Sequence, residues 1–87
     1  MTDQIKKDFP ILNQTINGKP LVYLDNAATT QKPKQVIDRV SHYYQTQNAN
    51  IHRGIYRLAA EATQAYEDCR RLTQTFFNAK SPKEIIF

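Results

Sequence analysis

The chain contains few of the residue types on which several classes of protein depend. It has one cysteine, Cys69, two glycines, Gly18 and Gly54, and no tryptophan. A single cysteine excludes an intramolecular disulfide and is typical of a protein in a reducing compartment. Two glycines far apart in the sequence cannot form a glycine-rich loop around a phosphate group. The sequence therefore carries neither a disulfide framework nor a phosphate-binding loop of that kind.

Long hydrophobic runs and basic clusters are also missing. No stretch approaches the length of a membrane span, and the first residues have no apolar segment of a secretory signal. The net charge is +4, but the longest basic runs are the pairs Lys6-Lys7 and Arg70-Arg71. Scattered basic residues are typical of a solvated surface rather than of a nucleic-acid footprint. We therefore expect a cytoplasmic protein with no membrane or nucleic-acid partner.

What the chain does contain is enough for one small, mainly helical unit. Its 87 residues are 40% apolar and 10% aromatic, which is too hydrophobic for a disordered segment. Helical spacing predicts a short helix over residues 3–8, a second over 33–46 and a long third helix over 57–78. Two short strands are expected at about residues 21–24 and 84–87, the first of them starting directly after Pro20.

The predicted helix over residues 57–78 carries an apolar stripe at helical spacing. The stripe consists of Leu58, Ala62, Ala65, Cys69, Leu72 and Phe76. Its alanines would let a sheet approach closely. Because Cys69 lies on this stripe, we expect a buried small hydrophobe rather than a nucleophile. Glu67 and Arg71, away from the stripe, have the i,i+4 spacing of an ion pair.

Two loops combine small and polar residues in a way that suits ligand binding. The first, Asn26-Ala27-Ala28-Thr29, follows the predicted strand and would expose backbone N–H groups without bulky side chains. The second, Asn48 to Gly54, places a titratable imidazole, His52, beside a fixed cation, Arg53. Taken alone, the first loop could equally be a strand-to-helix turn that needs small residues, and the second an ordinary loop with a satisfied histidine.

The order and spacing of four segments make a family resemblance specific. They are Tyr23 to Pro33, Asn48 to Gly54, Ala62 to Glu67, and Glu84 to Phe87. Together they resemble the start of a group II (Suf-type) cysteine desulfurase. That family includes selenocysteine lyases and belongs to the class V aminotransferase superfamily. The resemblance implies an α/β parent of fold type I, of which residues 1–87 would be a single N-terminal segment rather than a complete catalytic domain.

The same resemblance implies pyridoxal phosphate (PLP) chemistry in the parent protein. The family converts L-cysteine to L-alanine and holds the sulfur as an enzyme-bound persulfide for iron–sulfur cluster assembly. Its Schiff-base lysine, phosphate loop and persulfide cysteine would lie outside this chain. We therefore expect no catalytic, cofactor-binding or metal-binding residue here, and an isolated segment that is inactive and binds no PLP.

In the family, the loops that match residues 26–29 and 52–54 contribute to the substrate pocket, the second of them at the homodimer interface. The residues expected to bind substrate are Asn26, Ala27, Ala28, Thr29, His52, Arg53 and Gly54. The implied partners are the remainder of the parent enzyme, a second copy in the homodimer, and a sulfur-acceptor protein of the Suf pathway. The resemblance assigns no role to the other histidine, His42.

Two non-catalytic readings remain open beside this one. The chain could be a small basic helical module that binds a partner without catalysis, or a subunit that docks on a full-length desulfurase through its apolar helix faces. A helix-turn-helix is disfavoured because about ten residues, rather than three or four, separate the two long helices. As an isolated piece of such a desulfurase, the chain is expected to be mostly helical and either marginally stable or self-associating.

Overall fold

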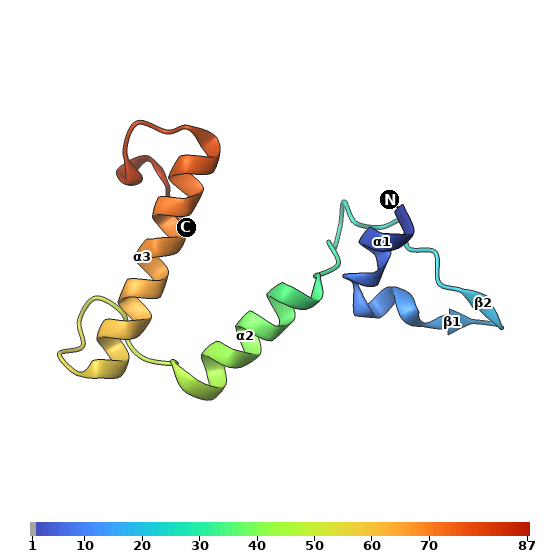
Figure 1. The fold of residues 1–87 in the computed structure, drawn as a ribbon, viewed down its shortest axis with the longest axis horizontal. Helices are drawn as coiled ribbons and strands as arrows, with labels where there is room; N and C mark the ends of the chain where they lie inside the picture. Colours follow the sequence, from blue (N-terminus) through green and yellow to red (C-terminus); the bar gives the residue numbers. More distant parts are fainter. Residues whose placement is uncertain (1) are drawn as a thin grey trace. The chain divides into compact units, whose positions relative to one another are not determined.

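A computed structural model describes residues 2–87 (Figure 1). The chain divides into two compact units, a first unit that ends at His42 and a second unit that begins at Tyr43. Within the described residues the structure is mainly helical with one pair of very short strands. This secondary-structure content confirms the expectation from the sequence. The boundaries of the strands differ from it.

The first unit opens with helix α1 (Thr2–Lys7), a 3-10 helix η1 (Pro10–Asn13) and a hairpin. The hairpin pairs β1 (Thr15–Ile16) with β2 (Lys19–Pro20) in antiparallel register. Its turn residues, Asn17 and Gly18, have φ angles of 51° and 73°. Left-handed conformations at both central residues are those of the two-residue turn that matches the twist of a hairpin, and Asn-Gly is its preferred sequence.

The strands predicted at 21–24 and 84–87 are not present, because neither segment has a strand beside it among the described residues. Residues 21–24 form no strand, although the Leu21 N–H donates to the Gln14 carbonyl at 3.0 Å, and Val22 and Leu24 are largely exposed. Pro20 is the last residue of β2, opposite Thr15. Proline is tolerated at this edge position although it has no N–H to donate to the neighbouring strand. Residues 85–87 follow a short 3-10 helix, η2 (Pro82–Glu84), in irregular structure.

Helix α2 (Lys34–Thr46) begins directly after Pro33, one residue later than predicted, and ends at the predicted residue. Proline suits this position because its missing N–H would have no intrahelical partner there. The Pro33 carbonyl accepts hydrogen bonds from the N–H groups of Val36 and Ile37, at 3.0 and 3.2 Å. An exposed ion pair between Lys34 Nζ and Asp38 Oδ2, at 2.7 Å, spans the first turn.

The second unit is built on helix α3 (Arg57–Phe77), the longest element of the chain. It ends at Asn78, which has a φ of 54° and donates its N–H to the Thr75 carbonyl, at 3.1 Å. Ala79 then donates to the Gln74 carbonyl at 3.0 Å, so the last helical carbonyls are satisfied. The predicted helix over 57–78 is thus confirmed to within one residue.

Burial is confined to one end of α3. Ala59 and Ala62, with exposed fractions of 0% and 2%, are the only buried apolar residues among those described. Farther along, Leu72 and Phe76 are 72% and 83% exposed. Cys69 is exposed too, contrary to the expectation from the apolar stripe, because nothing in the described chain covers that face. Within residues 2–87 no helix has the length and apolar character needed to cross a membrane.

Candidate functional site

The first small-residue loop closes on itself. The carbonyl of Asp25 accepts hydrogen bonds from the N–H groups of Ala28 and Thr29, at 3.2 and 3.1 Å. The Tyr23 hydroxyl donates to the Thr29 carbonyl at 2.6 Å, and Asn26 Oδ1 accepts from Gln31 N–H at 3.1 Å. Two of the N–H groups expected to face a ligand are therefore used inside the turn. All four predicted residues, 26–29, are exposed.

A pocket of about 520 Å³ opens in the first unit beside this loop. Phe9, Leu12 and Tyr23 supply apolar lining, and Asn26 and Thr30 supply polar atoms. Asn26 is the one member of the predicted set 26–29 that lines it. Within the first unit, the pocket thus joins the loop to α1 and η1.

The second loop, residues 48–54, is anchored to α3 by its backbone. His52 adopts a left-handed conformation with a φ of 68°, and its N–H donates to Thr63 Oγ1 at 2.8 Å. A left-handed non-glycine residue costs on the order of 1 kcal/mol, so the surrounding contacts must hold it. Gly54 is needed for a different reason. A Cβ at this position would lie 2.2 Å from the Ala59 Cβ, which leaves no room for a side chain.

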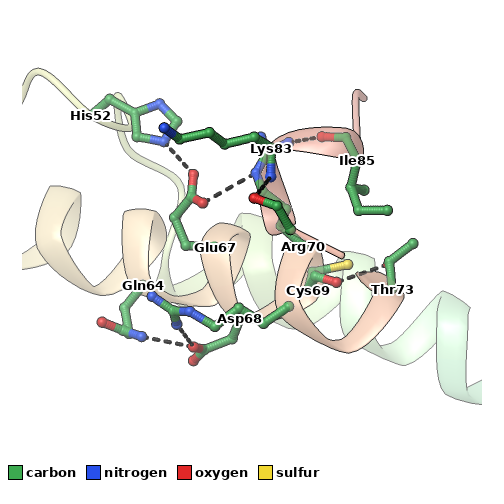
Figure 2. Close-up of polar contacts among 11 residues, drawn as sticks. His52, Gln64, Glu67, Asp68, Cys69, Arg70, Thr73, Lys83 and Ile85 are labelled. Atoms are coloured by element: carbon green, nitrogen blue, oxygen red, sulfur yellow. Dashed lines mark hydrogen bonds and ion pairs between the residues drawn. The ribbon is translucent and has the colours of Figure 1, made fainter. Parts of the chain in front are cut away.

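The His52 side chain is fixed on two sides. Its Nε2 lies 2.8 Å from Glu67 Oε1 on α3, and its ring meets the Tyr66 ring edge-on, with centroids 5.6 Å apart. Figure 2 shows the second ring nitrogen on the opposite edge of the imidazole, away from Glu67. The neighbouring Arg53 is exposed. His52 and Arg53 are thus both accessible to solvent in this loop.

Arg70 extends this network to the end of the chain (Figure 2). Its Nε donates to Glu67 Oε2 at 3.1 Å, and its Nη1 donates to the Ile85 carbonyl. The guanidinium carbon lies 5.4 Å from the Tyr66 ring centroid and 5.0 Å from that of Phe87. These contacts tie residues 85–87 to α3 through cation–π and hydrogen-bond interactions.

The hydrogen bond from His52 lowers the pKa of Glu67 below its usual 4.5, and the charge and hydrogen bond of Arg70 lower it further. Partial burial opposes the shift without cancelling it. Glu67 Oε1 pairs with His52 and Glu67 Oε2 pairs with Arg70. These two contacts stabilise the ionised form of the Glu67 carboxyl group. Glu67 is therefore an acceptor toward both His52 and Arg70.

Thr63, Tyr66 and Arg70 belong to this site although the sequence did not predict them, and the predicted pairing of Glu67 with Arg71 is wrong. Arg71 instead contacts Asp68 Oδ1, at 2.6 Å. The segment Ala62 to Glu67 is one of the four that carry the family resemblance, and residues three and four apart share a helix face. That spacing was the available signal.

The predicted substrate residues fall in different units. Residues 26–29 belong to the first unit, and residues 52–54, which the His52 and Gly54 contacts hold against α3, belong to the second. Within the second unit, His52, Glu67 and Arg70 form one connected network. The convergence of both loops on one substrate stays a prediction.

Comparison of the sequence with known proteins shows the family of the chain. The family model described as Aminotransferase class-V matches residues 22–87, and the chain belongs to that family. More particularly, relatives named as cysteine desulfurases or probable cysteine desulfurases match it, which confirms the resemblance to cysteine desulfurases; the Suf-type subgroup stays a prediction. A probable cysteine desulfurase from Synechocystis sp. is 57% identical over 83 residues, which are 95% of this chain and 20% of that protein. A cysteine desulfurase from Escherichia coli O1:K1 / APEC is 46% identical over 85 residues, or 98% of this chain and 21% of the relative.

A solved structure agrees. The apo structure of a cysteine desulfurase from Thermococcus onnurineus NA1 superposes with a TM-score of 0.75 at 37% identity, over 90% of this chain and 18% of that one. This neighbour supports the fold-type I parent that the sequence predicted. The chain spans between 12% and 21% of the length of the curated relatives that it matches.

Proposed function

We propose that this chain forms the substrate-side segment of a PLP-dependent, Suf-type cysteine desulfurase. That enzyme would convert L-cysteine to L-alanine and an enzyme-bound persulfide, which supplies sulfur for iron–sulfur cluster assembly in the cytoplasm. The observation that carries the proposal is the anchored loop 48–54. Its His52 and Arg53 lie in a segment 57% identical to a probable cysteine desulfurase.

The residues proposed to contact substrate are those of the two loops. Arg53 can bind the substrate carboxylate through a forked pair of hydrogen bonds, which lysine cannot form. The His52 imidazole can donate a hydrogen bond from one ring nitrogen and accept one at the other. Asn26, Ala27, Ala28 and Thr29 would shape the amino-acid pocket, and Gly54 allows the close approach of the loop to α3. Selenocysteine is the alternative substrate of the same chemistry.

The chain by itself does not fit PLP. Bound PLP would supply an electron sink for the substrate carbanion, and its Schiff-base lysine needs a desolvated position. Every lysine among residues 2–87 is exposed: Lys6, Lys7, Lys19, Lys32, Lys34, Lys80 and Lys83. The cofactor would therefore be held by other parts of the parent enzyme, and this segment would bind and orient the substrate. A second copy in a homodimer and a Suf-pathway sulfur acceptor are the further partners proposed.

Complementation tests this function. The chain would be co-expressed with the Synechocystis relative lacking its matching region, and alanine and sulfide formation from L-cysteine would be measured with PLP present. We expect activity from the pair and none from either piece. Arg53→Lys should lower it at least tenfold, because the fork to the carboxylate is lost. Arg57→Lys is the matched control. Arg57 is exposed, and its ion pair with Glu61 is a long one, at 3.7 Å. A Schiff-base absorbance or sulfide from this chain alone would contradict the proposal.

A docking module without catalysis is the second candidate, and the exposed apolar face of α3 favours it. Phe76 and Phe77 are 83% and 70% exposed, which is costly in water unless a partner covers them. In this case the chain would bind the intact Synechocystis enzyme and change its rate, without restoring the activity of the shortened form. Titration calorimetry with the intact and shortened enzymes separates the two functions.

A further inference from the structure

We infer that Glu67 is the positioning residue for His52, and that it holds Nε2 so that the Nδ1 edge of the ring is the one presented to a ligand. Only the binding of a ligand at the Nδ1 edge rests on the proposed function. The positioning itself is a property of the second unit and can be measured without substrate or cofactor.

The first support is that the backbone brings His52 to α3 independently of its side chain. The hydrogen bond from His52 N–H to Thr63 Oγ1, at 2.8 Å, sets the place of the Cα. Gly54 has no side chain, which allows the loop backbone to pack directly against Ala59 of α3. The side chain then needs only its two torsions fixed to have a single orientation.

The second support is that Glu67 and Tyr66 supply those constraints together. Glu67 Oε1 lies 2.8 Å from Nε2, and the Tyr66 ring stands at 88° to the imidazole. A carboxylate beside one ring nitrogen selects the tautomer that carries its hydrogen there, because the carboxylate can only accept. The lone pair of the neutral ring is therefore at Nδ1, on the edge that faces away from Glu67 (Figure 2).

The third support is that Glu67 is itself prevented from turning away. Its other oxygen, Oε2, accepts from Arg70 Nε at 3.1 Å, and Arg70 is only 20% exposed. Arg70 in turn lies beside the paired rings of Tyr66 and Phe87 and donates a hydrogen bond to the Ile85 carbonyl. Glu67 thus connects the loop that carries His52 to the segment 85–87.

The test is nuclear magnetic resonance of the 15N-labelled chain, at a pH high enough to leave the imidazoles neutral. Long-range proton–nitrogen spectra report the tautomer of His52, and exchange with water reports the protection of its ring N–H. We expect the Nε2–H tautomer in the wild type. Glu67→Ala should speed exchange of that proton at least fivefold and weaken the contact between the His52 and Tyr66 rings. His42 serves as the internal reference.

Two further variants keep the result interpretable. Glu67→Gln retains an acceptor oxygen without the charge, so we expect protection between that of the wild type and that of Glu67→Ala. Glu61→Gln removes a carboxylate from the same helix, where it pairs with Arg57, and should change nothing at His52. An Nδ1–H tautomer in the wild type overturns the inference, as does unchanged exchange in Glu67→Ala. If Glu67→Ala loses its helical amide shifts, Glu67→Gln decides alone. Complementation can succeed with either result, so a failure here leaves the proposed function standing.

Discussion

The hydroxyl of Thr63 accepts a hydrogen bond from the backbone N–H of His52, 11 residues earlier in the chain, at 2.8 Å. A helix side chain therefore holds a loop residue in the left-handed conformation that it would otherwise leave.

Replacing this hydroxyl should free the loop. Thr63→Val keeps the branched shape but leaves the His52 N–H without its acceptor, which costs about 1 kcal/mol. We expect faster hydrogen exchange at the His52 amide, by about fivefold, with the helix intact. Thr73→Val is the control, because Thr73 bonds only to the Cys69 carbonyl within α3. Equal exchange rates at His52 in the wild type and Thr63→Val would contradict the role of Thr63.

Gly54→Ala should destabilise the second unit, because its Cβ would meet the Ala59 Cβ at 2.2 Å. Overpacking of this kind costs about 1–3 kcal/mol. Urea unfolding followed by circular dichroism would measure the loss. The double variant Gly54→Ala with Ala59→Gly removes the opposing methyl group and should recover part of the lost stability. The recovery is incomplete because glycine inside a helix costs about 1 kcal/mol relative to alanine. A Gly54→Ala chain as stable as the wild type would show that the loop is not packed against α3.

The attachment of the loop to α3 should weaken in acid. The folded pKa of Glu67 is lowered below 4.5, chiefly by its hydrogen bond from His52, so its contribution is present above about pH 4.5 and is lost as the pH falls through the lowered value. In His52→Ala the pKa of Glu67 should rise toward 4.5. Carbon-detected titration of the Glu67 carboxyl measures both effects. An unchanged titration in His52→Ala would contradict the bond.

Arg70→Lys should release residues 85–87 while leaving α3 formed. Lysine lacks the planar fork with which the guanidinium donates to Glu67 and to the Ile85 carbonyl together. It also stacks less well on aromatic rings, so the attachment of residues 85–87 should lose about 1 kcal/mol of stabilisation. We expect a weaker contact between the rings of Tyr66 and Phe87, now 5.4 Å apart between centroids. Arg71→Lys, at an exposed ion pair with Asp68, is the matched control. The two variants behaving alike would disprove the special role of Arg70.

The exposed face of α3 should drive self-association at high concentration. Leu72→Ser and Phe76→Ser remove apolar surface that is 72% and 83% exposed, so they should lower association and leave helix content nearly unchanged. Sedimentation velocity across a concentration series measures this. A wild-type chain that stays monomeric throughout and unfolds cooperatively would contradict the expectation of marginal stability.

The sequence by itself determined the local elements. The 3.6-residue period defined α3, Pro33 marked the start of α2, and Asn17-Gly18 and Asn78 took the left-handed conformations that their short polar or absent side chains permit. These features depend on neighbours within a few residues. The family resemblance also followed from sequence, because it rests on the order of motifs.

Only the tertiary structure decided which distant groups meet. Residues 21–24 have the composition of a strand but no neighbouring strand, and a strand is stable only when its backbone groups are paired. Likewise, helix spacing allowed Glu67 to pair with Arg71. In the structure the Glu67 carboxylate instead contacts Arg70 and His52, which lies 15 residues earlier in the chain. Contacts between segments depend on loop closure and on shape, as at Gly54, and these are set by packing rather than by local preference.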